Sequence, residues 1–496
     1  MRENPNRANE LVNLLGDAIS TSPLECELYA HDLAAVPSLL AKALVRATPD
    51  AVARPRTVEE VSALLKYAST HRLPVTPRAS GSTAFHNAVP TNGGILLDLN
   101  AFRGIKDVDT ARQTATVLAA TRWKDLDDEL RYRWGLAVKT YPTSAPSATV
   151  GGWFNMGGQG VGSIKYGHVR DLVERAEAVL PSGEVKALGA ESDPPLSWFS
   201  GTEGTLGIVT SLSLSLRQAP EAVSSHLLSF ADLAALQRTA IALSNHPAKP
   251  YHLHFADEAY SRMAREAGLA SPTPAGLHSL FVRYEGSEAE MAAGASHISV
   301  LTRENGGTAF SGEIAAEEWQ HRFSEVRIKR AGPTLLGVEV LLPLSRLAQF
   351  IAAVQNLGRG YGVSFCTYGS IVSVDYVQPN VFFPTDERRG FPYLLSLSLT
   401  KKLHDVAHRL GGRPYGVGLW NTPYLGQAYP ARELEELRRR KRLLDPSGIM
   451  NPGKLYAPPL PLTQPFFGLA MDALALMFKT PLVRGNGQEA RMVPGP

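Results

Sequence analysis

Hydrophobic and polar positions recur along this chain with the two periods that are typical of helices and strands. The segment VEEVSALLKYASTHR, residues 58–72, has the spacing of an amphipathic helix, and a short apolar strand that ends at Val75 follows it. The segment SLSLSLR, residues 211–217, alternates strictly, which is the period of a strand with one buried face. These patterns predict a mixed α and β structure in the first half of the chain.

From Pro220 onward, short apolar runs alternate with helical patterns. Ser287, with Glu290 three residues later, forms a capping box that predicts the start of a helix. The other segments of this kind are HLLSF, ADLAALQRTAIALS, YHLHF, LHSLFVRYEG, VEVLLPLSRLAQFIAAVQNL and FPYLLSLSLTKKLHDVAHRLGG. Together they predict an antiparallel sheet with helices on one face.

A glycine-rich stretch, residues 141–171, lies before this second half. It contains seven glycines among small hydroxyl residues and almost no charge before Lys165. Glycine costs conformational entropy on folding, so this density indicates a backbone that lies against something large and flat. A loop-rich turn region is the alternative interpretation.

Two further segments have related chemistry. In residues 74–83, PVTPRASGST, serine, glycine and threonine offer backbone N–H and hydroxyl donors that suit pyrophosphate oxygens. Neither G-x-G-x-x-G nor G-x-x-x-x-G-K-[ST] occurs there, so a Rossmann or P-loop site is not supported. The segment at residues 199–210 turns sharply and then enters the alternating strand.

These segments, taken in order, resemble the FAD-binding domain of the vanillyl-alcohol oxidase and p-cresol methylhydroxylase (PCMH) family. A closing segment at residues 439–456 is also similar to that family, and the chain most resembles its FAD-linked D-lactate and glycolate dehydrogenases. The matching pieces are ARPRTVEEV, PVTPRASGS, AVPTNGGILLDL, TVGG, KYGHVRDLVERAEAVLPSGEV, GTEGTLGIVT and RRKRLLDPSGIMNPGKLY. The resemblance implies an α+β fold, with a two-subdomain FAD-binding domain of the PCMH type and an antiparallel-sheet cap domain for the substrate.

The resemblance also implies a set of FAD-binding residues. They are Pro77, Arg78, Ala79, Ser80, Gly81, Ser82, Thr83, Pro142, Thr143, Ser144, Thr149, Gly151, Gly152, Asn155, Gly158, Gly162, Tyr166, Gly167, Glu203, Gly204, Gly207, Ile208 and Asn451. Relatives that bind FAD covalently through this loop carry a histidine where this chain has Ser82, and His86 lies four residues further on. We therefore expect non-covalent FAD and treat His86 as an ordinary loop histidine.

The substrate side departs from the family pattern. Where the D-lactate and glycolate type carries the metal-binding motif H-x-G-D-G-N-x-H, residues 365–375 of this chain hold no histidine, so we expect no metal of that kind. Where the type carries E-H-G with its catalytic base, this chain has Pro414, Tyr415 and Gly416. Tyr415 is the candidate for handling the substrate proton, with Arg413 as its cationic neighbour.

Two more groups of residues are candidates on the substrate side. A basic cluster follows Trp319 at the place of a substrate-carboxylate arginine in relatives, and it consists of Arg322, Arg327, Lys329 and Arg330. An arginine such as Arg322 can bind a carboxylate, and the cluster would also suit a phosphate; a charged helix surface is the alternative. His404 and His408 have the i, i+4 spacing of a metal pair, but basic neighbours favour a solvated face.

Composition fits a soluble enzyme of two or three domains. The net charge is only +3, which argues against nucleic-acid binding. Two cysteines far apart, Cys26 and Cys366, give neither a disulfide framework nor iron–sulfur spacing. The N-terminus has no signal-peptide pattern. We expect a cytoplasmic protein, peripheral at the inner face of the membrane if it contacts one, with any iron–sulfur cluster on a partner subunit.

The predicted domain organisation follows shifts in composition. It comprises a helical arm (1–49), the FAD-binding domain (50–219), the cap domain (220–430), a return segment (431–457) and a tail (458–496). After four prolines, the tail holds FFGLAMDALALMFK, which is too short to span a bilayer. This segment can pack on its own enzyme, dock a redox subunit or lie on a membrane surface.

The leading functional hypothesis is an FAD-dependent dehydrogenase of a small D-2-hydroxy acid such as lactate or glycolate. Its electrons would pass to an iron–sulfur partner or a quinone. An FAD enzyme for another alcohol, or for a phosphorylated or lipid-linked substrate as in alkylglycerone-phosphate synthase, is the alternative within the fold. A non-catalytic flavoprotein subunit of a redox complex is the third hypothesis.

Overall fold

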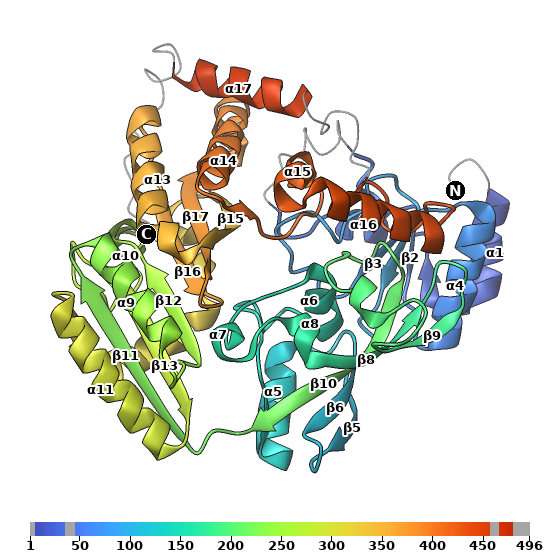
Figure 1. Cartoon of the computed structure of the whole chain (residues 1–496). Helices are drawn as coiled ribbons and strands as arrows, with labels where there is room; N and C mark the ends of the chain where they lie inside the picture. The colour runs from blue at the N-terminus through green and yellow to red at the C-terminus, as the bar shows by residue number, and fades with distance from the viewer. Residues whose placement is uncertain (1–4, 35–44, 457–465, 480–496) are drawn as a thin grey trace.

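The computed structural model describes residues 5–34, 45–456 and 466–479, which form two domains of mixed helices and sheets (Figure 1). The first domain contains two sheets, and the second contains one large antiparallel sheet. The predicted α+β class is confirmed. Among the described helices, none combines the length and apolar character that crossing a bilayer requires.

The first sheet carries the loop at residues 79–83. Its strands are, in order, β1 (Ile19–Ser20), β2 (Ala51–Ala53), β4 (Ile95–Asp98) and β3 (Val75–Arg78), and β2, β4 and β3 are parallel. The expected helix is α4 (Val58–His71), which begins in a capping box between Thr57 and Glu60. The expected strand starts at Val75 instead of ending there, so the loop leaves the sheet after Arg78.

The second sheet of the first domain is antiparallel. The alternating segment forms the long strand β10 (Ile208–Gln218), which lies at the centre of the sheet as its buried face requires. The neighbours of β10 are β6 (Thr114–Leu118), β7 (Leu136–Val138) and β8 (Val173–Val179), with β5 (Ile105–Asp109) and β9 (Val185–Leu188) outside them. The glycine-rich stretch supplies the short helices α6 (Val150–Met156), α7 (Ser163–Tyr166) and α8 (Val169–Leu172) beside α5 (Trp123–Trp134).

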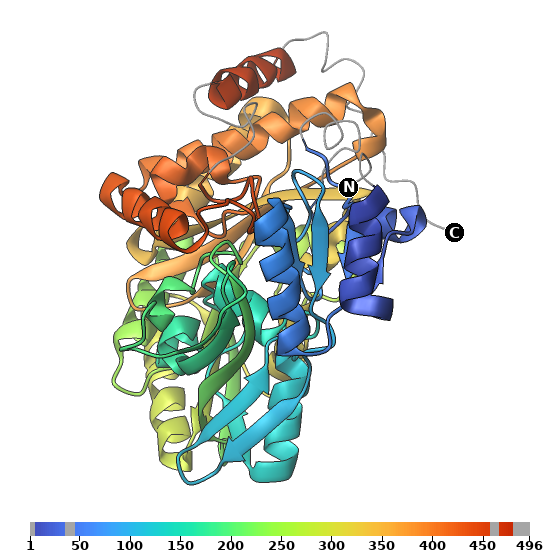
Figure 2. The same ribbon diagram turned by 90° about the vertical axis from the view of Figure 1, so that its right-hand side faces the viewer.

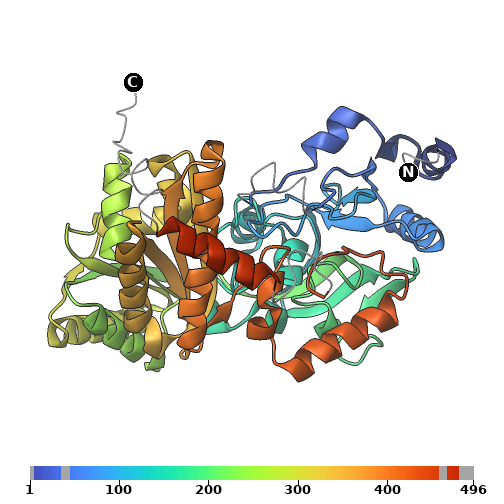
Figure 3. The same cartoon turned by 90° about the horizontal axis from the view of Figure 1, so that it is seen from above.

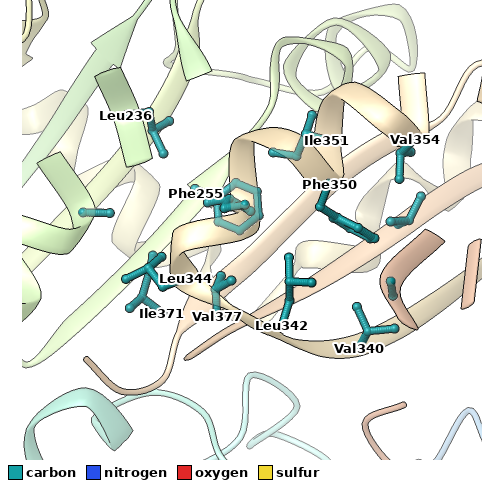
Figure 4. Close-up of a cluster of buried hydrophobic side chains, with 14 of the residues drawn as sticks. Leu236, Phe255, Val340, Leu342, Leu344, Phe350, Ile351, Val354, Ile371 and Val377 are labelled. Atoms are coloured by element: carbon teal, nitrogen blue, oxygen red, sulfur yellow. The ribbon is translucent and has the colours of Figure 1, made fainter. Parts of the chain in front are cut away.

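The second domain is built on eight strands. Their order is β14 (Thr308–Phe310), β11 (Ala222–Phe230), β13 (His278–Gly286), β12 (His252–Ala256), β16 (Cys366–Ile371), β17 (Tyr376–Thr385), β15 (Thr334–Pro343) and β18 (Arg413–Pro414). On one face, apolar side chains of alternate strand positions meet the helices, as Figure 4 shows for Phe255, Val340 and Phe350. The helices of this face are α9 (Leu233–Asn245), α11 (Glu288–Glu304), α13 (Leu347–Tyr361) and α14 (Phe391–Arg409). The predicted capping box of Ser287 and Glu290 is confirmed at the start of α11.

The expectation of helices on a single face is incomplete. The helices α10 (Glu258–Glu266) and α12 (Glu313–Gln320) pack against the other face of the sheet. Two neighbouring residues of β11 show the two faces: Leu228 belongs to the apolar cluster of the first face, and Leu227 contacts the cluster that contains Ala315 of α12. The 3-10 segment η4 (Glu325–Ala331) joins α10 in this layer.

The end of the chain returns to the first domain and then crosses back. The helices α15 (Leu425–Ala428) and α16 (Ala431–Leu444) lead to an isolated bridge between Met450 and Val75 of β3. The tail segment forms α17 (Phe466–Phe478), which lies on the outer side of α14 (Figures 2 and 3). Thus the helix packs on its own enzyme, the first of the three alternatives. The four prolines before it, and residues 35–44 of the predicted N-terminal arm, lie outside the described residues.

Candidate active site

The site lies in a cavity of about 1100 Å³ between the two domains. Small-molecule pockets usually occupy roughly 300–1000 Å³, so this cavity has room for a dinucleotide together with a substrate. Its walls come from the three predicted loops of the first domain, the strands β15 to β17, and the helices α14 and α17. The cavity is therefore where the sequence-predicted site residues can be located.

Most of the residues predicted to bind FAD line this cavity, and so does Tyr415. The lining members of the predicted set are Pro77, Arg78, Ala79, Ser80, Gly81, Ser82, Thr83, Pro142, Thr143, Ser144, Thr149, Gly151, Gly152, Asn155, Glu203, Gly204, Gly207, Ile208 and Asn451. Four other predicted FAD-binding residues, Gly158, Gly162, Tyr166 and Gly167, and the catalytic candidates Arg322 and Arg413 are not among the lining residues.

Protein packing accounts for part of the glycine-rich stretch outside the cavity. A side chain at Gly158 would overlap the indole of Trp153, and one at Gly162 would overlap the carbonyl oxygen of Lys139. The guanidinium carbon of Arg217 lies 5.6 Å from the centroid of the Tyr166 ring, so this ring also packs outside the cavity. At these positions the dense glycines fit other parts of the protein.

The loop after β3 has the form of a small cradle. Gly81 has φ +64°, and a Cβ there would lie 2.5 Å from Nη2 of Arg78. The Arg78 guanidinium in turn donates a hydrogen bond to the carbonyl oxygen of His31 at 2.5 Å, so it shapes the loop from behind. Ser80 and Ser82 add hydroxyl groups whose oxygens are 3.1 Å apart. This combination of hydroxyls and a Cβ-free turn fits a pyrophosphate.

His86 lies away from the cavity lining. It is buried, and its Nδ1 lies 3.3 Å from Oδ1 of Asp32. Ser82, at the place of the covalent histidine in relatives, lines the cavity. This placement is compatible with the expected non-covalent attachment, which stays a prediction.

Two buried amide oxygens in the cavity wall lack hydrogen-bond donors of the kind that FAD would supply. Oδ1 of Asn155 and Oδ1 of Asn451 have no hydrogen-bond partner among the described residues, and both residues line the cavity. Their amide nitrogens are held, because Nδ2 of Asn155 donates to Gly151 O at 2.8 Å and Nδ2 of Asn451 donates to Glu203 O at 2.7 Å. Each oxygen thus presents a fixed acceptor to a donor in the cavity, as the ring N–H, ribityl hydroxyls and adenine amine of FAD would supply.

Glu203 connects the first domain to the loop that follows Tyr415. Its carboxyl oxygens accept hydrogen bonds from the backbone N–H groups of Val417 and Gly418, at 3.0 and 2.9 Å. Burial raises the pKa of Glu203. A residue that the resemblance assigned to cofactor binding therefore also positions the chain around Tyr415.

Tyr415 lies at the junction of the two domains. Its hydroxyl oxygen accepts a hydrogen bond from the N–H of Gln159 at 3.0 Å, and its O–H donates one to the carbonyl oxygen of Gln159 at 3.3 Å. Burial, and after it the charge of Glu339, raise the pKa of Tyr415. Tyr415 is thus a neutral phenol at physiological pH, which can donate a hydrogen bond or pass a proton on but is a weak base.

Two carboxyl groups that sequence reasoning missed face the same cavity. Glu339 in β15 accepts a hydrogen bond from Nε2 of Gln378, and Glu325 in η4 accepts one from Oγ1 of Thr143 at 3.0 Å. Burial raises the pKa of Glu325 to about 7. Burial, and then the neighbouring charge of Glu325, raise the pKa of Glu339 to about 8. Glu339 could have been noticed in the sequence, because it is a carboxyl in the apolar run VEVLLP.

The other substrate-side candidates lie elsewhere. The Arg322 guanidinium is 3.3 Å from the hydroxyl of Tyr141 and lies over the ring of Trp319, while Arg413 is exposed on β18. His404 is buried beside the ring of Tyr424, with a pKa lowered to about 4 by burial, whereas His408 is exposed. Among the described lining residues, the cationic side chains are Arg78 and Lys329. Of the basic cluster that follows Trp319, Lys329 is thus the member that lines the cavity and the candidate for binding a substrate carboxylate.

Comparison with known proteins gives a consistent result. Residues 49–189 match the family described as "FAD binding domain", and residues 219–455 match "FAD linked oxidases, C-terminal domain". The glycolate oxidase subunit GlcD of Bacillus subtilis is 28% identical over 426 residues, covering 82% of this chain and 89% of its own. A D-lactate dehydrogenase of Archaeoglobus fulgidus is 27% identical over 423 residues, covering 82% and 90%.

A solved structure shares the fold. p-Cresol methylhydroxylase with substrate bound superposes with a TM-score of 0.75 at 17% identity, over 92% of this chain and 98% of that one. Together, the sequence and structure matches confirm the expected fold and confirm FAD as the cofactor.

Proposed function

We propose that this chain, which belongs to the FAD-linked oxidases and is an FAD-linked oxidoreductase, dehydrogenates a D-2-hydroxy acid. The observation that carries the proposal is the meeting of Tyr415 and Glu339 with the FAD-binding loops in one cavity. Relatives named for glycolate and D-lactate support an acid substrate. FAD, when bound, supplies the acceptor for the hydride of the oxidised carbon and passes the electrons on to an iron–sulfur partner or a quinone.

The residues of the chain handle the hydroxyl proton. Glu339 is the candidate acceptor, because a carboxylate with a pKa of about 8 is a much stronger base than an ordinary one. Tyr415 keeps its own proton, and the N–H of Gln159 holds its hydroxyl oxygen in place. Its O–H donates to the carbonyl oxygen of Gln159 at 3.3 Å in this structure and would turn from that long bond to the substrate oxygen. Gln378 fixes the Glu339 carboxyl from the neighbouring strand β17.

The substrate carboxylate would bind Lys329 in this proposal. A hydrogen bond to a charged group contributes about 1.5–3 kcal/mol, so Lys329→Met should weaken the affinity for a hydroxy acid by about 10- to 150-fold. The affinity for an uncharged alcohol should not change. Arg330→Met, on an exposed residue beside it that does not line the cavity, is the matched control.

A second candidate is an enzyme for an alcohol without a carboxylate. The two carboxyl groups in the cavity, Glu325 and Glu339, favour this second candidate. When they are ionised, they would repel an anionic substrate but not a neutral alcohol. Anaerobic mixing of the holoenzyme with a panel of D- and L-2-hydroxy acids and neutral alcohols, with bleaching of the flavin absorbance as the readout, separates the two. Reduction by acids alone supports the proposal, reduction by alcohols alone replaces it, and a flavin that no compound bleaches argues for a non-catalytic flavoprotein.

A further inference from the structure

The cavity does not end at Tyr415 and Glu339 but continues between the helices α14 and α17. We call this part the apolar annex and define it by Leu394 and Leu397 of α14 and by Phe467, Ala470, Met471 and Leu474 of α17. The α17 residues have the spacing i, i+3, i+4, i+7, which places them on one face of the helix. That face forms a wall of the cavity that contains the FAD-binding loops.

The open edge of β15 supplies the route into the annex. The strand β18 pairs with Val340 and Leu341, and the N–H of Tyr415 adds one bond to the carbonyl oxygen of Glu339, so the positions of β15 before Glu339 are not covered on this edge by β18. Val338 and Glu339 are consecutive in the strand and point to opposite faces, yet both line the cavity. The cavity therefore passes around this edge, from the side of Glu339 to the side of α14.

Several contacts fix α17 in place over the annex. Asp472 forms ion pairs with Lys402 and Lys401, at 2.7 and 3.1 Å. Ala475 is fully buried in the core of the second domain, and the ring of Phe478 contacts that of Tyr361 with centroids 5.9 Å apart. The wall is a packed part of the domain.

We propose that the apolar annex binds an aliphatic chain carried by the substrate, so that the enzyme prefers medium-chain or long-chain 2-hydroxy acids to lactate or glycolate. This inference rests on the proposed function. Lactate and glycolate have no group that would contact the annex walls, and an apolar cavity of this kind favours an apolar ligand over water. An oxygen atom on the aliphatic chain of the substrate could form a hydrogen bond there as well. Nδ1 of His404 and Oη of Tyr424 are buried in the cavity wall and have no hydrogen-bond partner among the described residues.

Chain length is the variable that tests the proposal. The holoenzyme is mixed anaerobically with D-2-hydroxybutyrate, D-2-hydroxyhexanoate, D-2-hydroxyoctanoate and D-2-hydroxydecanoate, and the Kd is taken from the saturation of flavin reduction. Each added methylene should tighten binding about fourfold until the annex is filled, the ratio that about 0.8 kcal/mol per buried CH₂ gives. Equal Kd values across the series would overturn the proposal.

Two variants of α17 make the test specific. Ala470→Phe places a ring in the annex and should remove most of the gain with chain length, while leaving the Kd of 2-hydroxybutyrate unchanged. Ala473→Phe on the same helix is the matched control and should behave like the unmodified enzyme, because Ala473 is exposed as Ala470 is but does not line the cavity. Equal losses in both variants would contradict the assigned site.

A binding measurement without turnover separates this inference from the proposed function. Saturated carboxylates from butyrate to decanoate, which lack the hydroxyl group, are titrated into the holoenzyme by calorimetry. If no hydroxy acid bleaches the flavin but affinity still rises with chain length, the annex is supported and the dehydrogenase proposal fails. If short hydroxy acids bleach the flavin but neither assay depends on chain length, the dehydrogenase proposal is supported and the annex proposal fails.

Discussion

The backbone N–H of Tyr415 donates a hydrogen bond to the backbone carbonyl oxygen of Glu339, with an N···O distance of 3.1 Å. The bond continues the pairing of β18 with β15 by one residue and brings together the two side chains that we assign to proton handling. The hydroxyl of Tyr415 is held by Gln159 of the first domain. Both domains therefore determine where these groups stand relative to the FAD-binding loops.

Glu339→Gln should slow flavin reduction by about two to four orders of magnitude, as the loss of a general base does. The amide is isosteric, so folding and FAD content should be preserved. Stopped-flow flavin reduction under anaerobic conditions measures the effect. A change below threefold would show that Glu339 is not the proton acceptor.

The pH dependence of the unmodified enzyme gives an independent test of Glu339. Because its pKa is raised to about 8, the carboxyl is mostly protonated at neutral pH and cannot accept a proton. The rate of flavin reduction should rise about tenfold per pH unit below pH 8 and level off above it. Glu325→Gln removes the neighbouring charge that raises this pKa, so the rise should move to lower pH. A flat profile between about pH 6 and pH 9 would contradict the assignment.

Tyr415→Phe should also slow flavin reduction, by about two orders of magnitude, with FAD content unchanged. If Tyr415 and Glu339 act on the same proton, the double variant with Glu339→Gln should be little slower than the slower single variant, since residues that act as a unit are not additive. Fully additive losses would mean that the two side chains contribute separately. An unaffected rate in Tyr415→Phe would leave Tyr415 with a packing role only.

Local patterns predicted much of the fold. The helix α4, the strand β10 and the capping box of Ser287 follow from side-chain period and capping chemistry within a few neighbouring residues. Helices on both faces of the large sheet were missed, because the apolar side of a helix such as α10 is visible in its sequence, whereas the face of the sheet that it covers is set only when the strands are placed.

The candidate site was less accessible to sequence reasoning. The loop around Gly81 could be found because its chemistry is contiguous in the sequence. Glu325, Glu339 and Tyr415 come from separate elements and act as a group only after folding. The sequence favoured Arg322 by its position after Trp319, but its guanidinium lies over that ring, and Lys329 seven residues later reaches the cavity.

Gly81→Asp should yield a colourless protein. The residue has a positive φ, its Cβ would meet the Arg78 guanidinium, and its carboxylate would repel the pyrophosphate proposed to lie in this loop. The ratio of flavin to protein absorbance after purification measures the loss. Gly426→Asp, at an exposed glycine with no neighbouring atoms in the way, is the control and should keep full FAD occupancy. A yellow Gly81→Asp protein would refute the placement of the pyrophosphate.

The outer face of α17 remains the candidate surface for an electron-accepting partner or a membrane. Leu469 and Leu476 on this helix are 68% and 69% exposed, although the opposite face packs on α14. The double variant Leu469→Glu and Leu476→Glu should keep FAD and anaerobic flavin reduction, because neither residue lines the cavity. It should weaken the transfer of electrons to the acceptor that supports turnover, raising the KM for that acceptor.

The comparison with a remote surface decides whether docking is specific. Val223→Glu, at a 52% exposed position of the second domain, adds charge without touching α17 and should leave the KM for the acceptor unchanged. Deleting residues 458–496 is a less specific test, because it would also remove a wall of the cavity. If the double variant and the unmodified enzyme reduce the acceptor with the same KM, the docking hypothesis fails. The role of α17 is then only to close the cavity.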